Sequence, residues 1–102
     1  MTLQVQVQSD PAATVVALGG EMDTHTAPRL TQALEAVFVG PDPTIVIDAS
    51  ELKFLDSSGI SALLQLRQRA IDAGGTLRLR TVSPAVRRVI EITGLVGVLG
   101  LE

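Results

Sequence analysis

Cysteine, tryptophan and tyrosine are all missing from this 102-residue chain, which also has only one histidine and two phenylalanines. The lack of cysteine excludes disulfides, thiolate metal sites and a cysteine nucleophile. The scarcity of aromatic rings leaves little to stack on bases or sugars, and a net charge of -3 gives no overall positive field for phosphates. We therefore expect no direct binding of nucleic acid.

Long hydrophobic runs are missing too. Apolar segments extend no further than about ten residues before a charge, glycine or proline interrupts them, so we expect no membrane span. The opening "MTLQVQVQSD" has no basic region followed by an apolar run, which argues against a signal peptide and for the cytoplasm. With 46% hydrophobic residues and no break in composition, the chain is expected to form a single domain over residues 1–102.

Alternation of apolar and polar residues predicts the strands. "LQVQVQ" at 3–8 alternates strictly, as a half-buried strand does, and "SDPAA" supplies a turn into a second strand, "TVVAL" at 14–18. "TIVID" at 44–48 does not alternate and has three β-branched residues at its centre, which indicates a central strand covered on both faces. "TLRLR" at 76–80 predicts another half-buried strand, and "LVGVLGL" at 95–101 a short apolar one.

Three helices are expected between these strands. The first follows Pro28 and has apolar residues spaced by three and four up to Val37. The second runs from Ser57 to about Ala73, and the third starts at Ser83-Pro84, where an N-cap precedes proline. The predicted order is β-β-α-β-α-β-α-β, an α/β fold with a mixed sheet and helices packed against it.

"DSSG" at 56–59 is the main candidate site, and catalysis by its serines finds no support. The G-x-S-x-G elbow of a serine hydrolase is absent because Leu55 stands two residues before Ser57. The single histidine, His25, lies near the start of the first predicted helix, where solvent exposure accounts for it. No closely spaced acidic cluster suggests a metal, and we expect neither a cofactor nor enzymatic activity.

Helix capping explains part of "DSSG". Asp and Ser are both favoured N-caps, but one cap is enough, whereas three consecutive cap-type residues precede Gly59. Capping alone and capping with a further function therefore both remain open. Free backbone N–H groups and the positive end of the helix dipole would also tolerate a phosphate on a serine there. A phosphoserine adds about -1.5 to -2 charges beside Asp56.

"GGEMDTHTAP" at 19–28 is the second segment of interest. It fits a strand end and a glycine turn, with Asp23 or Thr24 as the cap of the first helix. If this loop and "DSSG" lie at the same edge of the sheet, they form one surface.

Three blocks in this order resemble the anti-sigma factor antagonist family, small single-domain proteins of the STAS fold: "GGEMDTHTAPRL", "IVIDASELKFLDSSGISALLQL" and "GGTLRLRTVSPAVRRVIEITGL". The similarity runs from about Leu3 to Leu101. It implies partner switching, in which the unphosphorylated antagonist binds an anti-sigma factor and frees a sigma factor for transcription. It also implies that the anti-sigma factor is an ATP-using serine kinase, and that a metal-dependent PP2C-like phosphatase reverses the modification.

The resemblance also implies roles for single residues. The phosphorylated residue of the family is the first hydroxyl residue after the aspartate of D-S-[ST]-G, here Ser57, with Ser58 as its neighbour in the same loop and the second choice. At Ser61 relatives often have glycine, a departure that bears on the contact surface of the first helical turn. The partner-binding residues expected on this basis are Glu21, Asp23, Asp56, Ser58, Gly59, Ile60 and Ser61.

Two other classes of function stay open at this point. STAS-type domains resemble subunits of membrane transporters and parts of signalling assemblies, so this chain could instead regulate a transporter as a soluble subunit. A nucleotide or lipid ligand near "DSSG" is a further alternative, for which the chain offers no specificity residue. Because one fold serves many functions, the choice rests on the loop and its family context.

Overall fold

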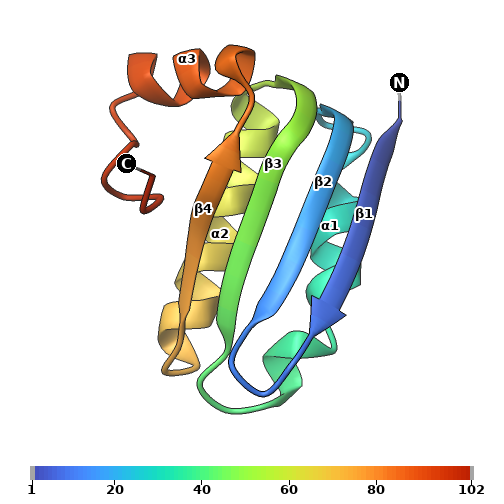
Figure 1. Ribbon diagram of the computed structural model, residues 1–102, viewed down its shortest axis with the longest axis vertical. Coiled ribbons are helices and arrows are strands. Elements are labelled where there is room, and N and C mark those ends of the chain that lie inside the picture. The colour runs from blue at the N-terminus through green and yellow to red at the C-terminus, as the bar shows by residue number, and fades with distance from the viewer. Residues whose placement is uncertain (1, 102) are drawn as a thin grey trace.

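The computed structural model describes residues 2–101, and its centre is one mixed sheet. Strand β1 pairs antiparallel with β2, while β2 with β3 and β3 with β4 are parallel. The strands lie side by side in chain order (Figure 1). Their bounds are β1 (Leu3–Ser9), β2 (Thr14–Met22), β3 (Thr44–Leu55) and β4 (Thr76–Val82).

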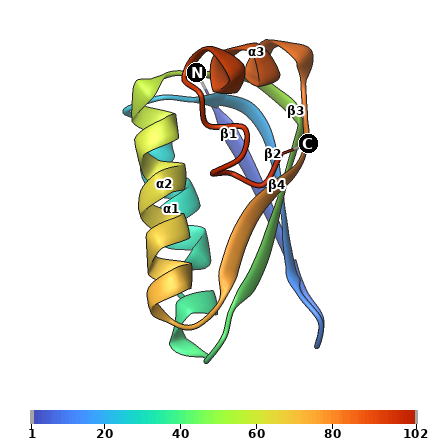
Figure 2. The ribbon, with the colours of Figure 1, turned by 90° about the vertical axis from the view of Figure 1, so that its left-hand side faces the viewer.

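Helices α1 (Ala27–Leu34) and α2 (Ser57–Asp72) cover one face of the sheet (Figure 2). Both connect neighbouring parallel strands, and right-handed crossovers in one direction place such helices on the same face. The apolar spacing predicted for the first helix extends past the end of α1, so Val37 lies in a short 3-10 turn, η1 (Val37–Val39), and still packs on the core. Helix α3 (Pro84–Ile92) lies across the end of the sheet (Figure 1).

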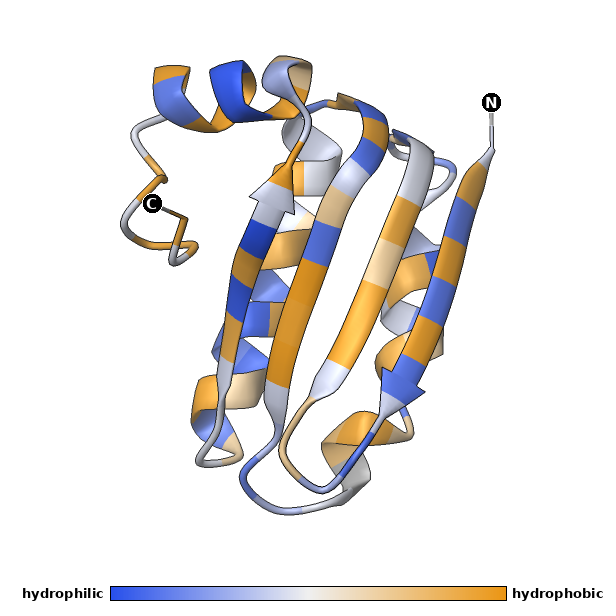
Figure 3. Cartoon of the chain, viewed as in Figure 1, coloured by the Kyte–Doolittle hydropathy of each residue, from blue (hydrophilic) through white to orange (hydrophobic). Residues whose placement is uncertain are grey.

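The core lies between the helices and the sheet. Leu3 is buried in the core and the glutamines of β1 are exposed. Figure 3 shows the alternation of hydrophobic and hydrophilic residues along this strand. The predicted central position of "TIVID" is confirmed, since β3 lies between β2 and β4 and Ile45, Val46 and Ile47 are all buried. Helices cover only one face of this strand.

The predicted last strand, 95–101, is wrong. Within the described residues this segment consists of turns, because its backbone groups bond locally: Leu99 N donates to Leu95 O at 3.0 Å and Leu101 N to Val96 O at 2.9 Å. Gly100 has a φ of +70, which lets the chain turn back where a strand would continue. One bond, from Leu79 N to Leu99 O at 2.8 Å, ties the segment to β4. The apolar residues of this segment pack into the core without forming a strand, and Leu99 is fully buried.

Leu99→Ala should therefore lower the free energy of unfolding, whereas Val98→Ala should change it little. Removing the fully buried side chain of Leu99 leaves a cavity, and such changes cost about 2–5 kcal/mol. Val98 is 42% exposed in the same segment, so Val98→Ala is the matched control and should change the free energy of unfolding by about 0.5 kcal/mol or less. Urea unfolding measures both. Equal effects of the two variants would contradict an anchoring role for this segment.

Candidate functional site

The two loops singled out in the sequence do meet at one edge of the sheet. Met22, the last residue of β2, pairs with Leu55, the last residue of β3. Asp56 N donates to Met22 O at 3.3 Å, so the parallel register continues one residue beyond the strands. The loop into α1 and the start of α2 consequently form one surface.

Asp56 caps α2, as the sequence predicted for this type of residue. Its backbone is extended, and its Oδ1 accepts a hydrogen bond from Gly59 N at 3.1 Å. Helix α2 therefore begins at Ser57. Asp56 is half-buried, and its carboxylate caps the start of α2.

The two serines differ in their surroundings. Ser57 is exposed, and its hydroxyl makes no hydrogen bond to any residue in the described part of the chain. Ser58 is half-buried, and its Oγ lies 2.7 Å from the hydroxyl oxygen of Thr24 in the other loop. The hydroxyl of Ser58 thus links the two loops, whereas Ser57 is exposed to solvent.

Gly59 is required by the packing of the chain itself. A Cβ at this position would run into Leu55 Cδ1 and would lie 3.1 Å from both Cγ and the backbone oxygen of Met22. Leu55 and Met22 occupy the space next to Gly59, so the glycine serves the internal packing of the chain. Ile60 is also buried, because its side chain belongs to the core. Ser61, in contrast, is exposed on the first turn of α2.

Asp23 holds the first loop together. It is only 8% exposed, and its Oδ1 accepts hydrogen bonds from His25 N at 2.9 Å and Thr26 N at 3.0 Å. The pKa of the Asp23 carboxyl is lowered, mainly by the N–H of Thr26; desolvation opposes this and the N–H of His25 adds to it. Asp23 is thus placed to shape the loop more than to face a partner.

The predicted cap of the first helix is wrong in detail. The N-cap of α1 is Thr26, which makes no side-chain capping bond, and the turn closed by Asp23 precedes it. Thr24 is directed to Ser58 instead, because the two loops are close enough for their hydroxyls to meet. The Thr26 hydroxyl donates to Glu21 O at 2.8 Å, and His25 is exposed, as expected for a solvated histidine.

Glu21 lies at the same edge but is turned toward β1. Its carboxylate oxygen accepts a hydrogen bond from Thr2 N at 3.1 Å, and the side chain is half-buried. Glu21 therefore adds negative charge to the surface near the loops while also stabilising the start of the sheet. No group of acidic or histidine residues within residues 2–101 is arranged to hold a metal ion.

A hollow between α1 and α2 was not predicted. Its volume is about 470 Å³ and it adjoins the two loops. Among the described residues, no charged side chain lines it. Sequence reasoning missed it because the hollow exists only where two helices lie side by side. It is lined by Thr24, Ala27, Pro28, Thr31, Gln32, Ser58, Ser61, Ala62 and Gln65.

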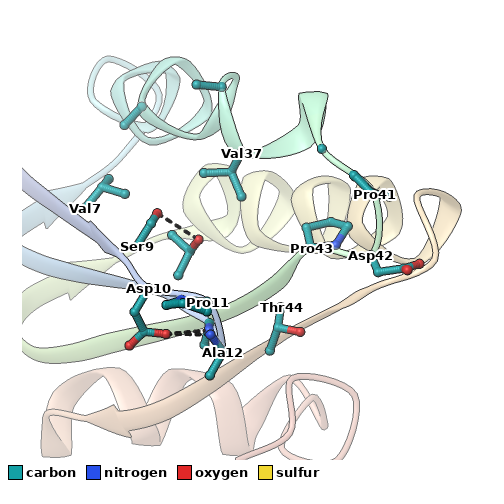
Figure 4. Close-up of a pocket in the computed structure, with 15 residues that line it drawn as sticks. Val7, Ser9, Asp10, Pro11, Ala12, Val37, Pro41, Asp42, Pro43 and Thr44 are labelled. Carbon is teal, nitrogen blue, oxygen red and sulfur yellow. Dashed lines mark hydrogen bonds between the residues drawn. The ribbon is translucent and has the colours of Figure 1, made fainter.

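A second hollow of similar volume lies at the opposite end of the sheet, around the β1–β2 turn (Figure 4). Asp10 in its wall is engaged locally, because its Oδ1 accepts from Ala12 N at 2.8 Å and Ala13 N at 2.9 Å. The hydroxyls of Ser9 and Thr14 lie 3.0 Å apart. These polar groups therefore build the turn.

Comparison with known proteins agrees with this geometry. The family model described as "Mlab, STAS domain" matches residues 5–100. An anti-sigma F factor antagonist of Paenibacillus polymyxa is 30% identical over 96 residues, which is 93% of this chain and 82% of the relative. The crystal structure of an anti-sigma factor antagonist from Mycobacterium paratuberculosis has a TM-score of 0.83 at 34% identity, covering 97% of this chain and 84% of that one.

SpoIIAA, an anti-sigma factor antagonist, is similar in two solved forms. The unphosphorylated form has a TM-score of 0.77 at 30% identity and covers 90% of this chain and 82% of its own. The phosphorylated form, from Bacillus, has a TM-score of 0.73 at 28% identity, with 94% and 87% covered. The chain therefore belongs to the STAS domain family, and the resemblance and the mixed α/β fold predicted from sequence are confirmed.

Asp23→Asn should lower stability at neutral pH, and the loss should shrink in acid. The variant keeps an oxygen acceptor but removes the charge that the N–H groups of the loop stabilise. Because the folded pKa is lowered from 3.8, the carboxylate contributes stability above that value and loses it as the pH falls through the folded pKa. Urea unfolding at about pH 7 and about pH 2 compares the two proteins. A difference that grows in acid would contradict this role.

Proposed function

We propose that this protein is an anti-sigma factor antagonist that works by partner switching. The unphosphorylated form would bind an anti-sigma factor and so free a sigma factor, and phosphorylation of Ser57 would end that binding. One observation carries the proposal: Ser57 is the exposed, unbonded first residue of α2, on a surface built from two loops. The named function of the relatives and the phosphorylated form of SpoIIAA support it.

The start of α2 suits a phosphoserine for electrostatic reasons. The first N–H groups of a helix lack partners within the helix, and the positive end of its dipole favours an anion. The carboxylate of Asp56 accepts a hydrogen bond from the N–H of Gly59. The backbone N–H groups of Ser57 and Ser58 belong to the same first turn of α2. A phosphate at Ser57 would add about -1.5 to -2 charges to a surface that already contains Asp56 and Glu21. The fold would persist while the surface potential changed.

The partner would contact the exposed part of this edge and the uncharged hollow beside it. Ser57 and Ser61 are exposed there, and Ser58 and Thr24 line the hollow. Gly59, Ile60 and Asp23 would act from beneath, by setting the positions of the contacting residues. A neutral side chain in the hollow and acidic groups facing Ser57 would suit the unphosphorylated form best, because those acidic groups would repel a phosphate added to Ser57.

The enzymes of the switch would be other proteins, and this chain would be their substrate. We propose an anti-sigma factor with serine kinase activity, which transfers phosphate from ATP to the Ser57 hydroxyl and releases ADP. A PP2C-like phosphatase would hydrolyse the ester again. This exchange would take place in the cytoplasm. No helix in the described part of the chain is long and apolar enough to cross a membrane.

Ser57→Ala should abolish phosphorylation, whereas Ser58→Ala should not. Each variant is incubated with the cognate anti-sigma kinase and ATP, and the modified residue is located by mass spectrometry. Ser58 is the matched control because it is the adjacent residue of the same type in the same helical turn. Ser57→Ala should also keep binding the kinase, while Ser57→Asp should weaken binding roughly tenfold or more, about 1.4 kcal/mol. Phosphate on neither serine, or purification with a transporter in place of a kinase, would contradict the proposal.

Thr24→Val should make the kinase less selective for Ser57 over Ser58. The valine cannot hydrogen-bond Ser58, whose hydroxyl lies 2.7 Å from that of Thr24. The fraction of phosphate on Ser58 should then rise while Ser57 remains the main site. Thr31→Val is the control, because Thr31 lines the same hollow. An unchanged distribution of phosphate in Thr24→Val would show that the Thr24–Ser58 contact has no influence on the choice.

A further inference from the structure

We propose that two copies of this protein associate through the free edges of their β1 strands, so that the two sheets become one continuous sheet. Strand β1 is the first in the sheet and has β2 as its only neighbour there; Figure 1 shows no element beyond it. The inference rests on backbone geometry and composition and is independent of the proposed switch.

The backbone groups that face outward can be identified from two hydrogen bonds. Thr2 O accepts from Glu21 N at 2.8 Å, and Asp10 N donates to Ala13 O at 3.0 Å, so both of these residues direct backbone groups toward β2. Residues of an antiparallel strand alternate in this respect. The residues that direct N–H and C=O outward are therefore Leu3, Val5, Val7 and Ser9.

Strand β1 lacks the features that normally protect an edge. Its sequence, "LQVQVQS", contains no charged residue and no proline. Its pairing with β2 continues over Leu3–Ser9 without a bulge, so nothing twists the edge away. Val7 is 38% exposed although it shares the core-facing side of the strand with Leu3. An edge of this kind is a template for pairing with another strand.

The opposite edge of the sheet is closed to such pairing. Leu79 N already donates to Leu99 O, and the turned segment that follows α3 lies against this side of β4. Arg78 and Arg80 add charge there, and a second copy would bring the same charges with it. With one open edge per molecule, association stops at a two-fold symmetric pair and does not propagate into a fibre.

The self-complementary register places Gln6 on the two-fold axis. Val5 of one copy then lies opposite Val7 of the other, and Leu3 opposite Ser9, so all four outward-facing residues form hydrogen-bonded pairs. Val7 gains an apolar neighbour, and the glutamines face one another on the open side of the sheet. A register centred on Val5 would place Ser9 beyond β1 of the other copy, which begins at Leu3. Since β2 separates β1 from β3, the pairing leaves the Ser57 edge free.

Cysteine crosslinking tests this register directly, because the chain has no cysteine of its own. In the proposed pair, residue 6 faces its own symmetry mate at the close Cα spacing of a non-hydrogen-bonded pair, about 4.5 Å. Gln6→Cys should therefore form a disulfide-linked dimer on mild oxidation. Gln4→Cys is the matched control on the same face of the same strand, and its copies would lie too far apart, since Gln4 faces Gln8 of the partner.

The wild-type protein should also show a concentration-dependent mass that approaches twice that of one chain in sedimentation equilibrium. Val7→Lys should shift the mass to that of a single chain, because the two lysines would lie diagonally across the two-fold axis and repel one another; circular dichroism checks that this variant is folded. A folded wild type that stays at the single-chain mass, or equal crosslinking of Gln6→Cys and Gln4→Cys, would overturn the proposal.

Discussion

The packing of Leu55 and Met22 beneath Gly59 is the contact on which the rest of the site depends. It joins the ends of two parallel strands, and the bond from Asp56 N to Met22 O extends that register into the loops. Without a side chain at position 59, α2 can start directly above the strand ends. The exposure of Ser57 is a consequence of this close packing, since the helix begins where the core ends.

Most polar residues at this edge of the sheet hold the two loops in place, and few are left to contact another molecule. From the sequence, Asp23 and Asp56 are expected to take part in binding a partner. In the structure, both carboxylates accept hydrogen bonds from backbone N–H groups of the loops. The hydroxyls of Thr24 and Ser58 bind one another. Within residues 2–101 the Ser57 hydroxyl has no hydrogen-bond partner, and this contrast with Ser58 is the physical basis for proposing Ser57 as the phosphorylated residue.

Two surfaces of the protein lie at different parts of the sheet, so binding at one leaves the other accessible. The loops at the ends of β2 and β3 form the proposed switch, whereas β1 presents an uncharged backbone edge two strands away from β3. The closed edge at β4 depends on the segment after α3, which we predicted to be a strand. The turns of this segment lie against β4, where Leu99 O accepts a hydrogen bond from Leu79 N, and they place the Leu99 side chain in the core.

The sequence alone predicts the four strands and three helices of residues 2–101, because alternation, helical spacing and caps are local properties, but β2 and β3 continue past the predicted 14–18 and 44–48 to Met22 and Leu55. It also singled out "DSSG" and the loop at 19–28. The exposure of Ser57, the internal packing against Gly59 and the turns of 95–101 follow instead from tertiary contacts. Each of these depends on residues distant in the chain, such as Thr24, Met22 and Leu79, whose proximity no local pattern encodes.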